Sequence, residues 1–164
     1  MRVAIADTGP LRYLVLIGAI EILPRLFESV VIPDVVNAEL RHARAPATVR
    51  GWAEAAPSWL ITRSAPSAED ADLWLLDAGE RAAIALAMTI QPAPILIEDR
   101  AGVATARIKG LGVIGTLGLL ERAARRGLID LRNALAMLQA TNFHARPELY
   151  ERLLARDRAW RGGA

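Results

Sequence analysis

The sequence predicts an α/β protein, a three-layer α/β/α sandwich around a central parallel sheet of four to five strands, with helices at the C-terminus. Short apolar runs of strand length alternate with longer segments of helical spacing, a pattern typical of a parallel sheet covered by helices on both faces. The 164 residues are 53% hydrophobic and 23% charged, a composition typical of a globular protein with a real core. We expect one domain over residues 1–164, with a helical part at about 130–160.

The first part of the chain alternates between strand and helix. "VAIAD" is an apolar run too short for a helix, and the apolar residues after it recur near helical spacing until Gly18. "EILPRLF" is expected to be a short helix with Pro24 in its first turn, where proline is tolerated. "SVVIP" is a second strand, and "DVVNAELRHA" is a helix that starts on a capping Asp34. These elements are expected at 3–7, 8–20, 21–27, 29–33 and 34–43.

The rest of the chain continues the alternation and then becomes helical. Residues 44–57 are rich in Ala, Arg and Pro and receive no assignment, and residues 64–74 are a polar connection. "APILIED" is a strand that ends on two acids, and the helix "LGLLERAARRGLI" ends at Gly127. The "RGGA" tail is expected to fray. Strands are expected at 59–63, 93–99 and 113–116, and helices at 75–90, 100–112, 117–129, 130–143 and 146–160.

Composition limits the chemistry available. The chain has no cysteine, so a metal ion must be held by oxygen or by the two histidines, His42 and His144. Net charge is +2 with a pI of about 9.6, and Lys109 is the single lysine. An arginine-rich chain suits a nucleic-acid partner, but a GC-rich genome produces the same bias, and composition does not decide between them. With no signal peptide and no apolar run of about 20 residues, we expect a soluble, cytoplasmic protein without a membrane partner.

Acidic residues gather where the predicted strands end. Asp7 ends the first strand, and Glu98 and Asp99 end the fourth. Glu39 and Glu80 lie on helices that follow strands, and helix N-termini point to the same edge of such a sheet. In parallel sheets ligands bind outside the carboxyl ends of the strands, where the strand order switches. The sequence therefore predicts that Asp7, Glu39, Glu80 and Asp99 converge there.

Carboxylates brought together in one pocket need a positive charge, because burying them unpaired is costly. A hard divalent cation is the natural partner, and Mg²⁺ uses only a few carboxylates. One or two such ions activate water for in-line displacement at a phosphodiester.

Each acid also has a plainer interpretation. Asp7 could cap the next helix, Glu39 could be a solvated helix residue, and Glu80 could stabilise a helix N-terminus. Asp99 could pair with Arg100 or Arg107 on the surface. Thr116 and Thr8 could each be a helix cap, or could hold a carboxylate, a water or a phosphate at the same edge.

The motifs, taken in order, resemble a PIN-domain protein, and more narrowly the prokaryotic branch of uncharacterised VapC-toxin-like PIN proteins. The matching blocks are "IADTGPL", "VIPDVVNAELRH", "LDAGERAAIALA", "ILIEDRAGVATARIKGLGVIGTLGLLERAARRGLI" and "ELYERLL". The resemblance implies a nuclease dependent on Mg²⁺ or Mn²⁺. Its catalytic residues would be Asp7, Glu39, Glu80 and Asp99, with Asp7, Glu80 and Asp99 on the metal and Thr8, Thr116 and Glu98 in support.

Three positions complicate this assignment. Glu98 competes with Asp99 for the role of fourth ligand, although Asp99 aligns better, and Asp77 competes with Glu80. Gly9 stands where the family has a serine, which removes one hydroxyl beside Asp7.

The resemblance further implies a toxin that cleaves RNA (tRNA or ribosomal RNA), a small antitoxin protein that silences it, and a homodimer. The leading hypothesis is a metal-dependent endoribonuclease that is the toxin of a toxin–antitoxin pair. One alternative is an inactive module that binds nucleotides or RNA, for which "GLGVIG" is only weak support because it leads into a strand. The other alternative is a structure-specific DNA nuclease.

The C-terminal helix and the tryptophans allow weaker expectations. Leu149, Tyr150, Leu153, Leu154 and Trp160 form an apolar series that packs on the protein's own core or forms a dimer or antitoxin surface. Trp52, Trp59 and Trp74 are expected in the core.

Overall fold

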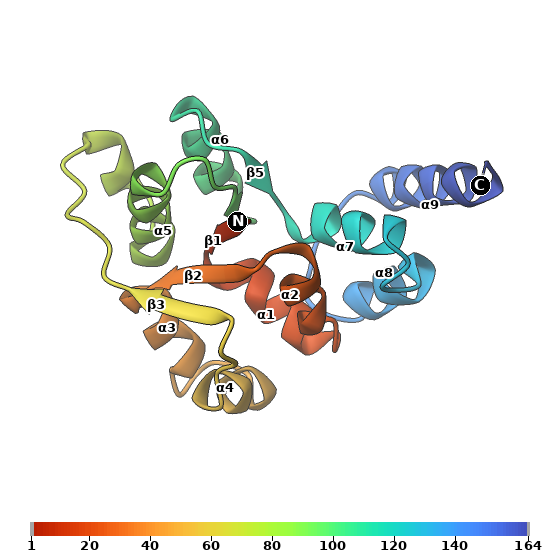
Figure 1. Cartoon of the computed structure of the whole chain (residues 1–164), viewed down its shortest axis with the longest axis horizontal. Coiled ribbons are helices and arrows are strands. Elements are labelled where there is room, and N and C mark those ends of the chain that lie inside the picture. Colours follow the sequence, from red (N-terminus) through yellow and green to blue (C-terminus); the bar gives the residue numbers. More distant parts are fainter. Residues whose placement is uncertain (1, 164) are drawn as a thin grey trace.

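The computed structural model describes residues 2–163, and its centre is a parallel β-sheet (Figure 1). Within those residues the sheet has five strands in the order β3-β2-β1-β4-β5, all parallel. The strands are β1 (Val3–Ala6), β2 (Ser29–Pro33), β3 (Leu60–Arg63), β4 (Ile95–Leu96) and β5 (Val113–Ile114). The order places β1 at the centre, between β2 and β4. The predicted α/β fold with a parallel sheet is confirmed.

Helices connect the strands and follow the sheet. Before β3 the chain forms α1 (Thr8–Leu16), a 3₁₀ turn η1 (Ile20–Ile22), α2 (Leu23–Leu26), α3 (Asp34–Arg41) and α4 (Ala47–Glu54). After β3 it forms η2 (Ala71–Leu75), α5 (Ala78–Thr89), α6 (Arg100–Ile108), α7 (Thr116–Arg125), α8 (Leu131–Gln139) and α9 (Pro147–Gly162). Figure 1 shows α7, α8 and α9 grouped at one side of the sheet, which confirms the C-terminal helices.

The core consists of two apolar layers, one on each face of the sheet. Alternate residues of a strand point to opposite faces. Ala4 and Ala6 of β1 pack in the layer that contains Leu11 and Leu14 of α1. Ile5 packs in the other layer with Ile84 of α5. Helices therefore cover both faces, as the alternation of elements predicts.

Several local details differ from the expectations. Residues 44–57, which received no assignment, contain α4, and the end of the polar connection at 64–74 belongs to η2. Asp34 is the first helical residue of α3 and does not cap it, because the N-cap position is Pro33, which follows the strand without a break. The strand predicted at 93–99 is ordered as a strand only at Ile95–Leu96, because the residues beyond it turn into the next helix.

The C-terminal helix α9 packs against α7 and α8. Tyr150 and Leu153 are buried in the core, so the apolar series packs partly on the protein itself. The helix continues to Gly162, so the tail is helical further than expected, with Arg161 paired to Asp157 at 3.0 Å; Ala164 lies outside the described residues. Trp160 is 56% exposed under the Arg125 guanidinium, which lies 5.4 Å from the ring centroid.

The tryptophans are not all core residues. Trp52 and Trp59 are half-buried and pack together, with ring centroids 6.1 Å apart. Trp74 is 63% exposed, and the Arg81 guanidinium lies 4.8 Å from the centre of its ring. The prediction that Trp74 is a core residue is wrong, because η2 presents the ring to solvent. Within residues 2–163, the helices are too short or too polar for any to cross a bilayer.

Candidate active site

Asp7 lies at the carboxyl end of the central strand. It follows β1 directly and occupies the N-cap position of α1, yet its side chain makes no capping hydrogen bond. Only 7% of the residue is exposed. Helix capping, the plainer interpretation of Asp7, therefore does not account for a carboxylate buried at this position.

Glu39 approaches the same place from α3. Its Oε2 accepts a hydrogen bond from the Thr8 hydroxyl, and the residue is half-buried. This hydrogen bond joins α3 to the start of α1, directly beside Asp7. The interpretation of Glu39 as a solvated helix residue is not supported.

Gly79, near the start of α5, shows how close the carboxylates come. A Cβ atom at this residue would lie 2.7 and 2.8 Å from the two carboxylate oxygens of Glu39, and 3.0 Å from Asp7 Oδ1. Both carboxylates therefore face one point on the α5 backbone. A residue without a side chain lets them approach it.

Glu80 enters the cluster from α5. It is 5% exposed, and Asp77 caps the helix by accepting a hydrogen bond from the Glu80 amide at 2.9 Å. Since Asp77 caps the helix, the Glu80 carboxylate is not the cap, although its place in the first turn of α5 still stabilises the helix N-terminus. Asp77 and Glu80 both belong to the cluster, but they have different roles: Asp77 caps α5, and Glu80 presents a carboxylate with no capping role.

Asp99 lies at the N-terminus of α6, beside Glu80. Its Oδ2 accepts a hydrogen bond from the Ala101 amide at 2.9 Å, and the residue is exposed. A Cβ at Gly102 would lie 3.4 Å from the Glu80 carboxyl carbon, which shows how near α6 is to Glu80. Within residues 2–163, Asp99 forms no salt bridge with Arg100 or Arg107.

The electrostatics of the cluster reflect burial without a cation. Burial raises the pKa of Asp7 to about 7, and the charges of Asp77 and Glu39 add to the shift. The amides of Thr8 and Gly9 oppose the shift in the pKa of Asp7. None of the acids at this edge has a salt bridge within the described part of the chain.

The pKa of Glu80 is raised in the same way as that of Asp7. Burial raises its pKa to about 7, and the charges of Asp77, Asp99 and Asp7 contribute. The carboxylates at the end of β1 and at the starts of α5 and α6 are therefore close enough to repel one another. This is the arrangement expected where a site must attract positive charge.

Glu98 is held apart from this cluster. Its Oε2 accepts hydrogen bonds from the Thr116 amide at 2.7 Å and the Thr116 hydroxyl at 2.6 Å, and Thr116 is fully buried. Burial raises the pKa of Glu98, and the two Thr116 donors lower it. Thr116 holds a carboxylate, one of its predicted alternatives, and the N-cap of α7 is Gly115.

Gly9, two residues after Asp7, lies close to Glu98. A Cβ there would lie 3.3 Å from Glu98 Cβ, so a serine would press against Glu98.

Sequence reasoning missed the importance of Asp77 and Gly79. Asp77 was treated only as a rival of Glu80, although its charge raises the pKa of both Asp7 and Glu80. The spacing in "DAGE" was the available signal, because an acid three residues before a glutamate is typical of a capped helix start. No pattern in the sequence indicated that Gly79 must be free of a side chain.

A cavity of about 630 Å³ adjoins the acidic cluster. Thr8 and Glu39 form part of its wall, together with apolar side chains of α3 and α4. Three basic residues also line it: Arg12, His42 and Arg44. The cavity gives an extended or phosphate-bearing ligand a path to Glu39.

The donor chemistry at this edge fits a hard divalent cation. The candidate ligands are carboxylate oxygens, which suit Mg²⁺ and Mn²⁺. As the side chains of residues 2–163 lie, no group of three is arranged to hold a metal ion. Asp77 and Asp99 each direct an oxygen to a helix amide, and Thr8 holds Glu39. An ion held here by fewer carboxylates would complete its coordination with water.

Comparison with known proteins identifies the family. Searches of curated proteins and of solved structures returned no significant match. A family model described as a PIN domain matches residues 3–158, nearly the whole chain. PIN domains are commonly nucleases that use divalent metals. The chain therefore belongs to the PIN-domain family.

Proposed function

We propose that this protein is a metal-dependent endoribonuclease of the VapC-like branch, which hydrolyses RNA phosphodiester bonds as the toxin of a toxin–antitoxin pair. The observation that carries the proposal is the meeting of Asp7, Glu39, Glu80 and Asp99 at the carboxyl edge of the sheet, with the pKa of Asp7 and of Glu80 raised to about 7. Membership of the PIN family supports a hydrolase that acts on nucleic acid.

The proposal gives the residues distinct roles. Asp7, Glu80 and Asp99 would hold Mg²⁺ or Mn²⁺, with Asp77 close enough to strengthen the negative field. When bound, the cation supplies an activated water and charge stabilisation at the phosphate. Glu39 presents Oε1 to accept a proton, because its Oε2 is occupied by the Thr8 hydroxyl. Thr116 holds the Glu98 carboxylate apart from these ligands.

The metal site is tested by titrating Mg²⁺ or Mn²⁺ into the protein by calorimetry. We expect Asp7→Asn and Asp99→Asn each to weaken binding at least tenfold, which is about 1.4 kcal/mol. Glu98→Gln is the matched control, because it removes a neighbouring carboxylate that Thr116 holds apart. If Glu98→Gln weakened binding as much as Asp99→Asn, Glu98 would also be a metal ligand and the proposed assignment would be wrong. Undiminished binding in all three variants would contradict a metal site at the carboxyl edge.

The reaction is tested on single-stranded RNA, single-stranded DNA and a flap duplex, with and without Mg²⁺. We expect cleavage of RNA, and a loss of at least about a hundredfold in Asp7→Asn, the scale typical of losing a charge-stabilising group. Preference for the flap duplex would instead indicate a structure-specific DNA nuclease. Binding of RNA without cleavage would indicate a module that has kept the fold but not the activity.

The toxin role is tested in growing bacteria. Expression of the chain should arrest growth and deplete intact tRNA or ribosomal RNA, while Asp7→Asn at equal abundance should not. The cavity beside Glu39 offers apolar walls and a route to the carboxylates, so we place the antitoxin there. Co-expression of a small antitoxin protein that binds this chain should restore growth, and light scattering should find a homodimer. Growth unaffected by the active protein would contradict the toxin role and leave the nuclease standing.

A further inference from the structure

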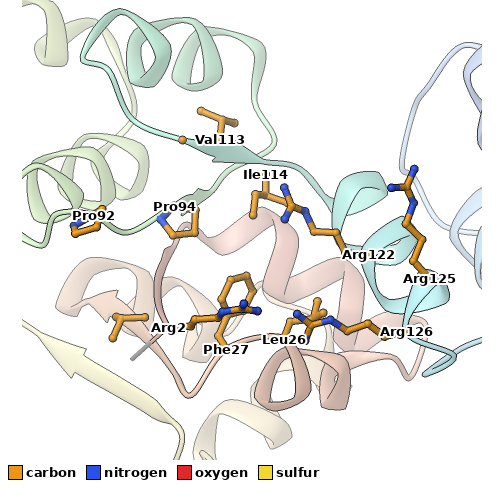
Figure 2. Close-up of a pocket in the computed structure, with 12 residues that line it drawn as sticks. Arg2, Leu26, Phe27, Pro92, Pro94, Val113, Ile114, Arg122, Arg125 and Arg126 are labelled. Carbon is orange, nitrogen blue, oxygen red and sulfur yellow. The ribbon is translucent and has the colours of Figure 1, made fainter.

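A second pocket lies at the opposite edge of the sheet from the acidic cluster, and its volume is about 570 Å³ (Figure 2). Arg2 and Val3 stand at the amino end of β1, Pro94 precedes β4, and Gly112 precedes β5. The end of α2 and the last turn of α7 complete the wall. The acids described above follow the strands, so the two sites occupy different edges.

The pocket combines a cationic rim with an apolar wall. Four arginines line it: Arg2, Arg122, Arg125 and Arg126. In Figure 2, Arg2 extends from the β1 side, and Arg122 and Arg126 extend from α7 toward the space between Phe27 and Ile114. The apolar wall is made by Val3, Leu26, Phe27, Pro92, Pro94 and Ile114.

The four arginines differ in whether they already have partners within the protein. Arg125 pairs with Glu121 at 3.3 Å and lies over Trp160, and Figure 2 shows it extending away from the other three. Arg126 donates one hydrogen bond to the Arg25 carbonyl at 3.0 Å, which leaves its other donors available. Within residues 2–163, neither Arg2 nor Arg122 has a salt bridge.

The position of these charges argues for an anionic ligand. Basic residues in the last turn of a helix commonly offset its negative end, and Arg122 and Arg125 are in the last turn of α7. Arg2 directly precedes β1 and has no such role. Its charge enters the same pocket as Arg122 and Arg126, which places three guanidinium groups around one space. Guanidinium forks match phosphate oxygens in geometry and charge.

We propose that this pocket binds a nucleotide unit, with its phosphate on Arg2, Arg122 and Arg126 and its base against Phe27 and the two prolines. A pocket of this volume is within the range that holds small ligands. The base supplies a flat apolar surface for the ring of Phe27, and the phosphate supplies the negative charge. The unit belongs either to a free nucleotide or to an RNA strand, which share this chemistry.

The test measures binding by calorimetry in EDTA, so that metal-assisted binding at the carboxyl edge does not contribute. The probes are AMP, adenosine, inorganic phosphate and a short 5′-phosphorylated single-stranded RNA. We expect AMP to bind at least tenfold more tightly than adenosine or phosphate, and more weakly as salt rises. Tighter binding of AMP than of the RNA indicates a free nucleotide, and the reverse order indicates a strand.

Arginine variants then locate the site. The double variant Arg2→Gln/Arg122→Gln should weaken binding of AMP or RNA at least tenfold, because it removes two charge-assisted contacts. Arg107→Gln is the matched control, since Arg107 is exposed in the last turn of α6 and lies outside the pocket. Phe27→Leu should weaken AMP and leave phosphate unchanged.

The proposal is overturned if none of the probes binds, or if the double variant binds them as the wild type does. It is also overturned if Arg107→Gln weakens them equally, since that would indicate a diffuse charge effect. Thermal unfolding of each variant separates lost contacts from lost folding. Because the assay contains no divalent metal and reads no cleavage, its failure leaves the proposed nuclease untouched, and the reverse also holds.

Discussion

The two edges of the sheet carry opposite charges, and the charged groups are buried at one edge and exposed at the other. At the carboxyl edge Asp7 and Glu80 are buried, lack cationic partners among the described residues, and have pKa values near 7. At the amino edge the arginines are exposed to water and cost the fold little. Clustered charge alone therefore does not identify a functional site. Charge that a fold keeps buried at an energetic cost is the stronger indication.

The largest expected difference between the edges is in how stability depends on pH. The folded protein holds protons on Asp7 and Glu80 that the unfolded chain releases near the ordinary pKa values of these groups, 3.8 and 4.5. Between about pH 4 and pH 7 the folded state therefore binds more protons, and stability falls as pH rises through that range. In EDTA, Asp7→Asn should be about 1–3 kcal/mol more stable than wild type at pH 8, with no difference near pH 4.

Denaturant unfolding from pH 4 to pH 8.5 measures this effect. The control is Glu69→Gln, which removes an exposed carboxylate and should follow the wild-type profile at all pH values. A wild-type stability that rises with pH over this range would contradict burial of the two carboxyl groups.

The next effect concerns Gly79. In Gly79→Ala the new Cβ would displace the Glu39 carboxylate and crowd Asp7 Oδ1, so we expect affinity for Mn²⁺ to fall about tenfold. Stability should change little, since the displaced atoms are at the end of a flexible side chain. Gly51→Ala in α4 is the control, because its Cβ would have no neighbour within 4 Å. Equal affinity in the two variants would show that crowding of Asp7 Oδ1 at this point of α5 does not affect the metal site.

Thr116→Val is expected to have a smaller effect. It removes the hydroxyl donor to Glu98 at a fully buried position and leaves the amide donor in place. We expect a loss of about 1 kcal/mol in the free energy of unfolding, measured in denaturant at pH 7. Thr105→Val in α6, which removes a hydroxyl from a partly buried position, should lose less. No loss in Thr116→Val would show that Glu98 does not depend on this tether.

The smallest effect belongs to the amino edge. Arg122 is exposed and unpaired within the described residues, so Arg122→Gln should change the free energy of unfolding by less than about 0.5 kcal/mol. The change should be the same at pH 5 and pH 8, in contrast to Asp7→Asn. A larger destabilisation would mean that the arginines stabilise the fold, and would weaken the contrast between the two edges.

The sequence predicted the fold well where apolar periodicity was strong. The strand "SVVIP" and the helix after it were placed closely because an apolar run ends at Pro33 and a period of helical spacing follows. The helix α4 (ATVRGWAE) was missed because it is short, contains Gly51 and lies in a segment rich in Ala, Arg and Pro. Its inward side consists of only Val49, Trp52 and Ala53, which is a weak periodic signal.

The site was predicted through topology more than through any residue. Asp7 and Asp99 were expected together because central parallel strands share an edge, and the order β2-β1-β4 brings β1 and β4 side by side. The separation of Glu98 from Asp99 was not predictable, since it depends on hydrogen bonds from Thr116, which is distant in sequence. The close approach at Gly79 likewise depends on the packing of α3 against α5.

The burial pattern of α9 has a consequence for local opening. Tyr150 and Leu153 in its first half are buried. The second half is held by the ion pair of Arg156 with Glu121 of α7 at 2.8 Å, by the pair within the helix between Asp157 and Arg161, and by Trp160 against Arg125. Amide hydrogens should therefore exchange with solvent in a gradient along the helix, slowest near Leu153 and fastest toward Gly162. We expect local opening of α9 to be confined to the turns beyond Arg156, while α7 and the carboxyl edge stay folded.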